Sequence, residues 1–209
     1  MKKIKRILLL ALCFSMLSLS LVSCGAKESE SELLAIAKDL TEQSARVNEI
    51  VFGDGIALKK DGYSVGAYTE ADEESLAFYG VSSVEDIKAR LSAVYSEATA
   101  AWVEGTVLTS VKEQSQVLTY ARYYDDKKME GVNFVPVLMV RENHEQMAFG
   151  KASYADYTLQ SSSRKEAVFT VDITVTDGEE TKVFSDVRVT MVKEENGWRL
   201  DTTTYASLK

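Results

Sequence analysis

Thiol and imidazole side chains are almost absent from this sequence of 209 residues. It contains two cysteines and one histidine, too few for the Cys and His sets that hold structural zinc ions or iron–sulfur clusters. Basic side chains are also outnumbered, with 24 Lys and Arg against 32 Asp and Glu and a net charge of −8. Nucleic-acid binding needs a basic surface that displaces phosphate counterions, so this charge balance argues against nucleic acid as a partner.

Recognisable catalytic motifs are missing as well. The only imidazole, His144, lies in a polar stretch typical of an exposed hairpin loop, and no Gly-x-Ser-x-Gly elbow accompanies it. The zinc-protease helix motif, the phosphate-cradling glycine loop and the dinucleotide fingerprint are absent too. Adjacent carboxylates such as Asp125 and Asp126 lack the alternating spacing of a calcium loop. We therefore predict a protein that is not an enzyme, with no metal site and no cofactor.

What the sequence does contain is a strong targeting signal in its first 24 residues. Four basic side chains within the first six residues precede an apolar run from Ile7 to Val22, which is the pattern of a secretory signal. The run ends in Leu-Val-Ser-Cys-Gly, which resembles the bacterial lipobox, in which a cysteine, here Cys24, is diacylated after cleavage just before it. There are two alternatives. The apolar run is an uncleaved membrane anchor, or it is an ordinary signal peptide in which the cysteine is incidental.

The lipobox divides the chain into a signal peptide at 1–23, a lipidated tether at 24–32 and a single domain at 33–209. We expect an extracytoplasmic protein held by the lipid on Cys24, on the outer face of a Gram-positive cytoplasmic membrane, with no other membrane contact. Cleavage removes four basic and no acidic side chains. The mature chain therefore keeps 20 basic and 32 acidic side chains, a net charge of −12.

Hydrophobic periodicity predicts helices first and strands later. A stripe at steps of three and four from Leu33 to Val51 indicates one helix, and a capped stripe over 83–103 indicates a second of about 20 residues. A hairpin is expected around Asp61-Gly62, with a polar loop after it at 70–74. Strands are expected at 117–124, 134–140, 146–159, 167–176, 182–193 and 198–205.

This order predicts an α+β fold in which N-terminal helices pack on one face of a curved, cone-like antiparallel sheet. Hairpin turns are expected at Asp177-Gly178 and at Asn196-Gly197. The only proline, Pro136, cannot donate to a strand ladder, and it therefore indicates an edge strand or a bulge.

An aromatic and acidic cluster is the candidate for partner binding. Tyr120 and Tyr124 share one face of the expected strand and Tyr123 takes the other, so at least one of these rings is expected to face solvent, where Tyr is a preferred interface anchor. Together with Asp125 and Asp126 at the start of an expected convex loop, Tyr123 and Tyr124 form the predicted partner-binding set.

Two stretches resemble a known family. They are Val84-Glu85-Asp86-Ile87-Lys88 with Leu91 and Val94-Tyr95, and the terminal Gly197-Trp198-Arg199-Leu200-Asp201-Thr202-Thr203-Thr204-Tyr205. The element order is similar to the nuclear transport factor-like or cystatin-like α+β fold. These stretches resemble the IseA-type inhibitors of cell-wall DL-endopeptidases. The resemblance implies a non-enzymatic binding module that blocks the cleft of a cell-wall hydrolase.

Two other functions are compatible with the same fold. A cone-shaped domain can hold a small molecule or a lipid in its mouth. Less favoured is an enzyme that uses a pair of carboxylates, or a tyrosine and an aspartate, in the same cavity. A surface binder should present its contact residues on convex segments such as 125–131, whereas a ligand binder should hold polar groups inside an apolar cavity.

Overall fold

The α+β fold class is confirmed by a computed structural model, which describes residues 28–113, 116–119, 121–144 and 150–204. The helices are α1 (Glu30–Val51), α2 (Glu73–Tyr79), α3 (Val84–Val94), α4 (Glu97–Val103) and a π-helix, η1 (Glu104–Leu108). The strands are β1 (Ser64–Val65), β2 (Tyr68–Glu70), β3 (Val111–Glu113), β4 (Gln116–Thr119), β5 (Tyr123–Glu130), β6 (Asn133–Arg141), β7 (Lys151–Ser162), β8 (Glu166–Asp177), β9 (Glu180–Glu194) and β10 (Gly197–Leu200).

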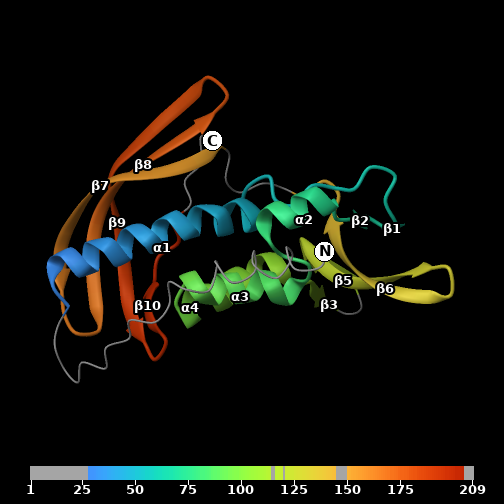
Figure 1. The fold of residues 1–209 in the computed structure, drawn as a ribbon, viewed down its shortest axis with the longest axis horizontal. Helices are drawn as coiled ribbons and strands as arrows, with labels where there is room; N and C mark the ends of the chain where they lie inside the picture. The colour runs from blue at the N-terminus through green and yellow to red at the C-terminus, as the bar shows by residue number, and fades with distance from the viewer. Residues whose placement is uncertain (1–27, 114–115, 120, 145–149, 205–209) are drawn as a thin grey trace, which may run out of the picture.

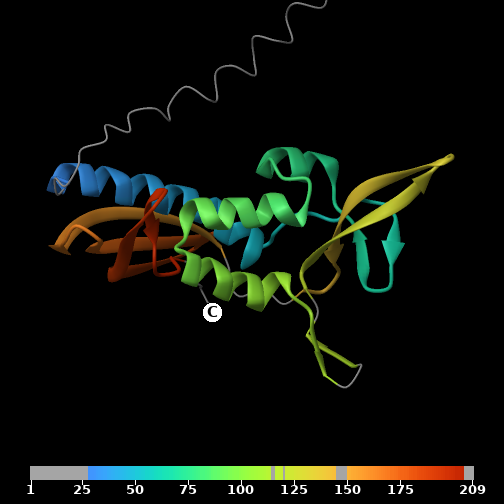
Figure 2. The same ribbon diagram turned by 90° about the horizontal axis from the view of Figure 1, so that it is seen from below.

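The antiparallel strands are divided between two main sheets, a division that the hydrophobic pattern does not predict. One sheet has the order β1-β2-β6-β5 and the other the order β10-β9-β8-β7, while β3 and β4 form a separate hairpin. The second sheet curls around α1, and the first lies at the other end of the molecule (Figures 1 and 2). The split arises because β6 takes β2 as its second neighbour, so the meander does not run on from β6 into β7.

Helix α1 forms the central support of the fold. It begins at Glu30, three residues before the apolar stripe, because Ser29 and Glu32 form a capping box that satisfies amides of its first turn. The predicted stripe is buried on the face that packs against β7 and β10, with Leu33 and Val51 fully inaccessible. Phe169, Ile173 and other inward-facing residues of the curled sheet fill the space beneath it.

The single helix predicted over 83–103 is wrong, because the chain breaks at Tyr95. Tyr95 is extended, with φ −99° and ψ 152°, and forms an isolated bridge with Leu200 of β10. Ser96 then starts α4, and its hydroxyl accepts a hydrogen bond from the Thr99 amide. The apolar periodicity continues across the break to Trp102, and periodicity alone therefore cannot reveal it. In the structure Trp102 is 48% exposed, and α4 buries Ala100 and Val103 instead.

The segment before α3 also differs from the prediction. The chain turns at Asp61-Gly62, where the Gly62 amide donates to the Lys59 carbonyl at 3.1 Å, but the hairpin of β1 and β2 turns at Gly66. Part of the expected polar loop at 70–74 is instead helical, because the Asp72 side chain accepts a hydrogen bond from the Ser75 amide and caps α2. Acidic residues favour turns and helix N-termini alike, which explains the mistaken loop.

The C-terminal strands agree better with the sequence. Turns at 178 and 197 join β8 to β9 and β9 to β10 as consecutive hairpins, as predicted. Pro136 lies in β6 opposite Lys127 of β5, beyond the three residues of β6 that pair with β2. Among the described residues that stretch of β6 has a neighbour on one side only, so the prediction of an edge position is confirmed locally.

Candidate functional site

Exposed apolar side chains gather at one end of the molecule. Nine large hydrophobic side chains are exposed in the described residues, and seven of them belong to residues 58–78 and 129–134. The most exposed are Val132, at 94%, Phe78, at 74%, and Met129, at 67%, followed by Phe134, at 65%. Solitary exposed hydrophobic residues are ordinary, but several on neighbouring segments mark a contact surface.

Residues 125–137 of the β5–β6 hairpin are called here the ribbon. The tip of the ribbon lies at the centre of this surface. Its strands pair from Tyr123 with Val140 to Glu130 with Asn133 and are closed by the two-residue loop Gly131-Val132. The ribbon projects from the body, and its tip lies at the opposite end of the molecule from the start of α1 (Figures 1 and 2). Met129 and Phe134 are directly paired and share one face, so they present one apolar patch beside Val132.

A buried ion cluster fixes the base of the ribbon. Glu70 of β2 is 6% exposed and accepts hydrogen bonds from Lys128 at 2.7 Å and from Lys59 at 3.3 Å. Burial alone would raise the pKa of Glu70, but the hydrogen bonds from Lys128, the Tyr63 amide and Lys59 bring it below its usual value. The carboxylate therefore stays ionised and ties the ribbon to β2. A groove of about 230 Å³ lies beside this cluster, with Pro136 in its lining.

The structure separates the two predicted tyrosines of the ribbon base. Tyr123 is 1% exposed, and its hydroxyl donates to the Ile50 carbonyl at 2.7 Å, so its assignment to a partner surface is corrected: the ring belongs to the core. Tyr124 is partly exposed and stacks edge-on against Tyr68, with ring centroids 4.7 Å apart. Burial, with Asp126 nearby, raises the pKa of Tyr124 to about 12. Tyr120 lies outside the described residues.

The two predicted aspartates have local structural partners. Asp125 is exposed and accepts a hydrogen bond from the Val84 amide at 3.0 Å, which joins the ribbon to the first turn of α3. Asp126 accepts hydrogen bonds from the Tyr124 hydroxyl and the Lys127 amide. Both lie in strand β5 and not in the expected convex loop, which begins only at Gly131. Cys24 lies outside the described residues.

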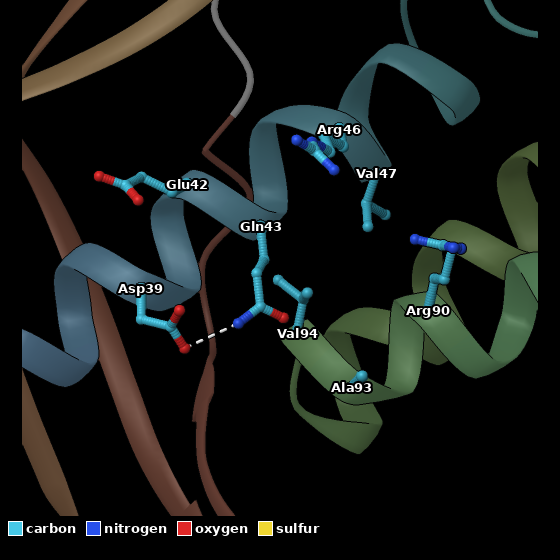
Figure 3. Close-up of a pocket in the computed structure, with 8 residues that line it drawn as sticks. All are labelled: Asp39, Glu42, Gln43, Arg46, Val47, Arg90, Ala93 and Val94. Atoms are coloured by element: carbon cyan, nitrogen blue, oxygen red, sulfur yellow. Dashed lines mark hydrogen bonds between the residues drawn. The ribbon is translucent and has the colours of Figure 1, made fainter. Parts of the chain in front are cut away.

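A second concave surface lies between α1 and α3 and is called here the helix groove. It has a volume of about 340 Å³ and is lined by Asp39, Glu42, Gln43, Arg46, Val47, Arg90, Ala93 and Val94. Figure 3 shows Arg90 reaching from α3 towards α1, where Arg46 and Val47 lie. The sequence analysis did not find this groove, because its two walls come from helices that are far apart in the chain.

A third polar cluster is buried near the end of α1. Arg122 is 3% exposed, and its Nη2 donates to the carbonyls of Gly53 and Asp54. Its Nε and Nη1 are buried and have no hydrogen-bond partner among the residues that the structure describes. His144 is half-buried, not exposed as predicted. Burial, together with the positive charges of Arg122 and Arg141, lowers the pKa of His144 to about 4. The imidazole is therefore neutral at physiological pH.

Comparisons with known proteins add no family. No protein-family model matches the sequence, and a search of curated proteins finds no significant match. Within the described residues, no helix is long and apolar enough to cross a membrane. The same part of the chain contains no group of three or more His, Cys, Asp and Glu side chains arranged to hold a metal ion.

Proposed function

We propose that this protein is a lipid-anchored, non-enzymatic binding module of the cell surface that docks the tip of its ribbon onto a cell-wall hydrolase. The observation that carries the proposal is the projecting hairpin with Met129, Val132 and Phe134 exposed at its tip. Large apolar side chains that desolvate together supply most of the affinity of a protein interface. A narrow ribbon can enter a cleft that a flat surface cannot.

The DL-endopeptidase class of partner follows from the resemblance to the IseA-type inhibitors and from charge. The mature chain carries a net charge of −12, which would speed encounter with a basic enzyme surface at low salt. The curled sheet is packed with side chains beneath α1, and this favours binding through the outer surface over a ligand held in the interior. Blockage by the ribbon requires no catalytic group on the inhibitor.

The test is a titration of the purified mature chain into a peptidoglycan-hydrolysis assay driven by a DL-endopeptidase. We expect inhibition that saturates near one inhibitor per enzyme. Val132→Asp places a charge at the tip, where docking would desolvate it, and should weaken inhibition by about tenfold or more. Val132 lies in a two-residue loop with an almost fully exposed side chain, so the substitution should leave the fold intact.

A matched control separates the tip from the general effect of an added charge. Val183 of β9 is 55% exposed and lies outside the ribbon, so Val183→Asp should inhibit as the unsubstituted chain does. Equal inhibition by the Val132→Asp chain would exclude the ribbon tip as the contact. Absence of both binding and inhibition would exclude the hydrolase.

A further inference from the structure

We propose that the helix groove binds the free carboxyl-terminal residue of a peptide, with the carboxylate held by Arg46 and Arg90. The two guanidinium groups come from the facing walls of the groove, α1 and α3 (Figure 3). Arginine pairs favour carboxylates because each guanidinium offers parallel N–H donors that match the two oxygens. This site is separate from the ribbon and does not rest on the function proposed above.

Both arginines keep donors available for a ligand. Arg46 forms no ion pair with any residue in the described part of the chain, and its side chain is exposed. Within the described ranges, Arg90 donates only through Nη2, to the Gly80 carbonyl at 3.0 Å. Two arginines without an ion pair among the described residues line one groove, in a chain with an excess of 12 acidic side chains after signal cleavage. A bound anion would relieve the repulsion between them.

The acidic side chains of the groove are already engaged or turned away. Asp39 accepts a hydrogen bond from Gln43 Nε2 at 2.7 Å. Glu42 pairs with Lys38 at 4.0 Å on the exposed side of α1 and points away from α3 in Figure 3. The lining therefore presents the two guanidinium groups against the one carboxylate of Asp39, and its net charge is positive.

The remaining lining favours a peptide end over a bare inorganic anion. Val47 and Val94 are buried, and with Ala93 they form an apolar wall suited to a small side chain. Because Gln43 donates through Nε2 to Asp39, its Oε1 is left to accept a hydrogen bond from a peptide N–H. A volume of about 340 Å³ falls within the range of small-ligand sites.

The test is calorimetric titration of the full chain, in detergent, with N-acetyl-alanyl-alanine as the probe. We expect a dissociation constant of about 1 mM, which ligands of this size typically reach. Arg46→Gln should raise that constant at least about tenfold, since a hydrogen bond to a charged group is lost. Arg46 has no structural hydrogen bond among the described residues, so the variant should keep the melting temperature of the unsubstituted chain.

Two controls make the outcome decisive. Arg164→Gln removes an exposed arginine from the β7–β8 turn, outside the groove, and should bind the probe as the unsubstituted chain does. The carboxyl-amidated probe should not bind. The proposal is overturned if the free acid fails to bind at ten times the expected constant, if the amide binds equally well, or if Arg46→Gln has no effect.

Probe chirality identifies the source of the peptide. Preference for the D,D form would assign the groove to cell-wall stem peptides, and preference for the L,L form would assign it to protein carboxyl termini. Either preference supports the site. Because the ribbon variants are measured by hydrolase inhibition and the groove variants by peptide binding, failure of one proposal is distinguishable from failure of the other.

Discussion

At the scale of single residues, the most constrained position is Gly55. Its φ is +75°, and a Cβ atom there would lie 2.1 Å from Arg122 Nη2 and 2.4 Å from the Tyr123 hydroxyl. Only glycine therefore allows the loop after α1 to approach this buried pair. Burial lowers the pKa of Arg122 and raises that of Tyr123, but the guanidinium keeps its charge and bonds to backbone carbonyls. The cluster explains why Tyr123 is unavailable to a partner.

The pKa of His144 gives the first prediction, on acid stability. The native value of about 4 lies below the ordinary 6.5, so between these pH values the unfolded chain binds more protons than the native chain. The free energy of unfolding should be fully retained above pH 6.5 and should fall as the pH drops towards 4. His144→Gln should reduce this loss, as measured by denaturant unfolding at about pH 7 and about pH 5.

Carboxylates do not obscure this measurement. Glu70 and Glu28 have pKa values below the ordinary 4.5 of a glutamate, so the stability that they contribute begins to fall at lower pH than the stability that depends on His144. Equal loss of stability between about pH 7 and about pH 5 in both chains would show that His144 is not the responsible group.

At the scale of elements, the break between α3 and α4 lets the chain reverse, so that α4 runs back beside α3 (Figure 2). The Tyr95 ring is buried, and its hydroxyl donates to Asn48 of α1 at 2.6 Å. Burial raises the pKa of Tyr95 to about 12, so the phenol stays protonated and can donate. The Ser96 amide donates to the Leu200 carbonyl at 2.8 Å. One turn of chain thereby connects α1, α3, α4 and β10.

Ser96 provides the prediction at this scale. Its buried hydroxyl caps α4 and also donates to Asp201. Ser96→Ala should lower the free energy of unfolding by about 1–2 kcal/mol, the usual effect of losing an N-cap. Denaturant titration followed by circular dichroism measures it.

Ser92 is the matched control for Ser96. It lies exposed within α3, so Ser92→Ala should change stability by less than about 0.5 kcal/mol. Equal stabilities for the two variants would show that the cap contributes nothing to holding α4.

At the scale of the whole molecule, α1 starts at one end and the apolar tip of the ribbon is exposed at the other (Figures 1 and 2). Glu28, four residues after Cys24, pairs with Lys193, whose ammonium lies 5.8 Å from the centroid of the buried Trp198 ring. The Lys193 hydrogen bond lowers the pKa of Glu28 despite the opposing effect of burial. If Cys24 carries lipid, the three residues between it and Glu28 keep Glu28 within about 14 Å of the anchor.

Lipidation gives the prediction at this scale. Cells supplied with a labelled fatty acid should incorporate it into the unsubstituted chain, and Cys24→Ser should abolish incorporation because the thiol is the acylated group. Cys13→Ser changes the only other thiol, which lies in the predicted signal, and should leave incorporation unchanged. Labelling of the Cys24→Ser chain would overturn the lipobox assignment.

The sequence by itself determined those features that rest on local chemistry. Apolar periodicity predicts α1 and most strands of the curled sheet, because burial of one face imposes a period of 3.6 or 2. The Ser83 cap of α3 and the turns at Asp177-Gly178 and Asn196-Gly197 act over three or four residues and are equally visible. The α+β class follows from the order of these segments, and the edge position of Pro136 follows from its missing N–H.

Only the tertiary structure decided what depends on distant partners. The chain breaks at Tyr95 because the Leu200 carbonyl accepts a hydrogen bond from the amide of the next residue, Ser96. Tyr123 is buried because its hydroxyl donates to the Ile50 carbonyl. The ribbon tip is exposed because β2 pairs with only three residues of β6, and the helix groove is made by residues more than 40 positions apart. Such contacts leave no periodic trace in the sequence, since each is set by how whole elements pack and not by the residues next to it.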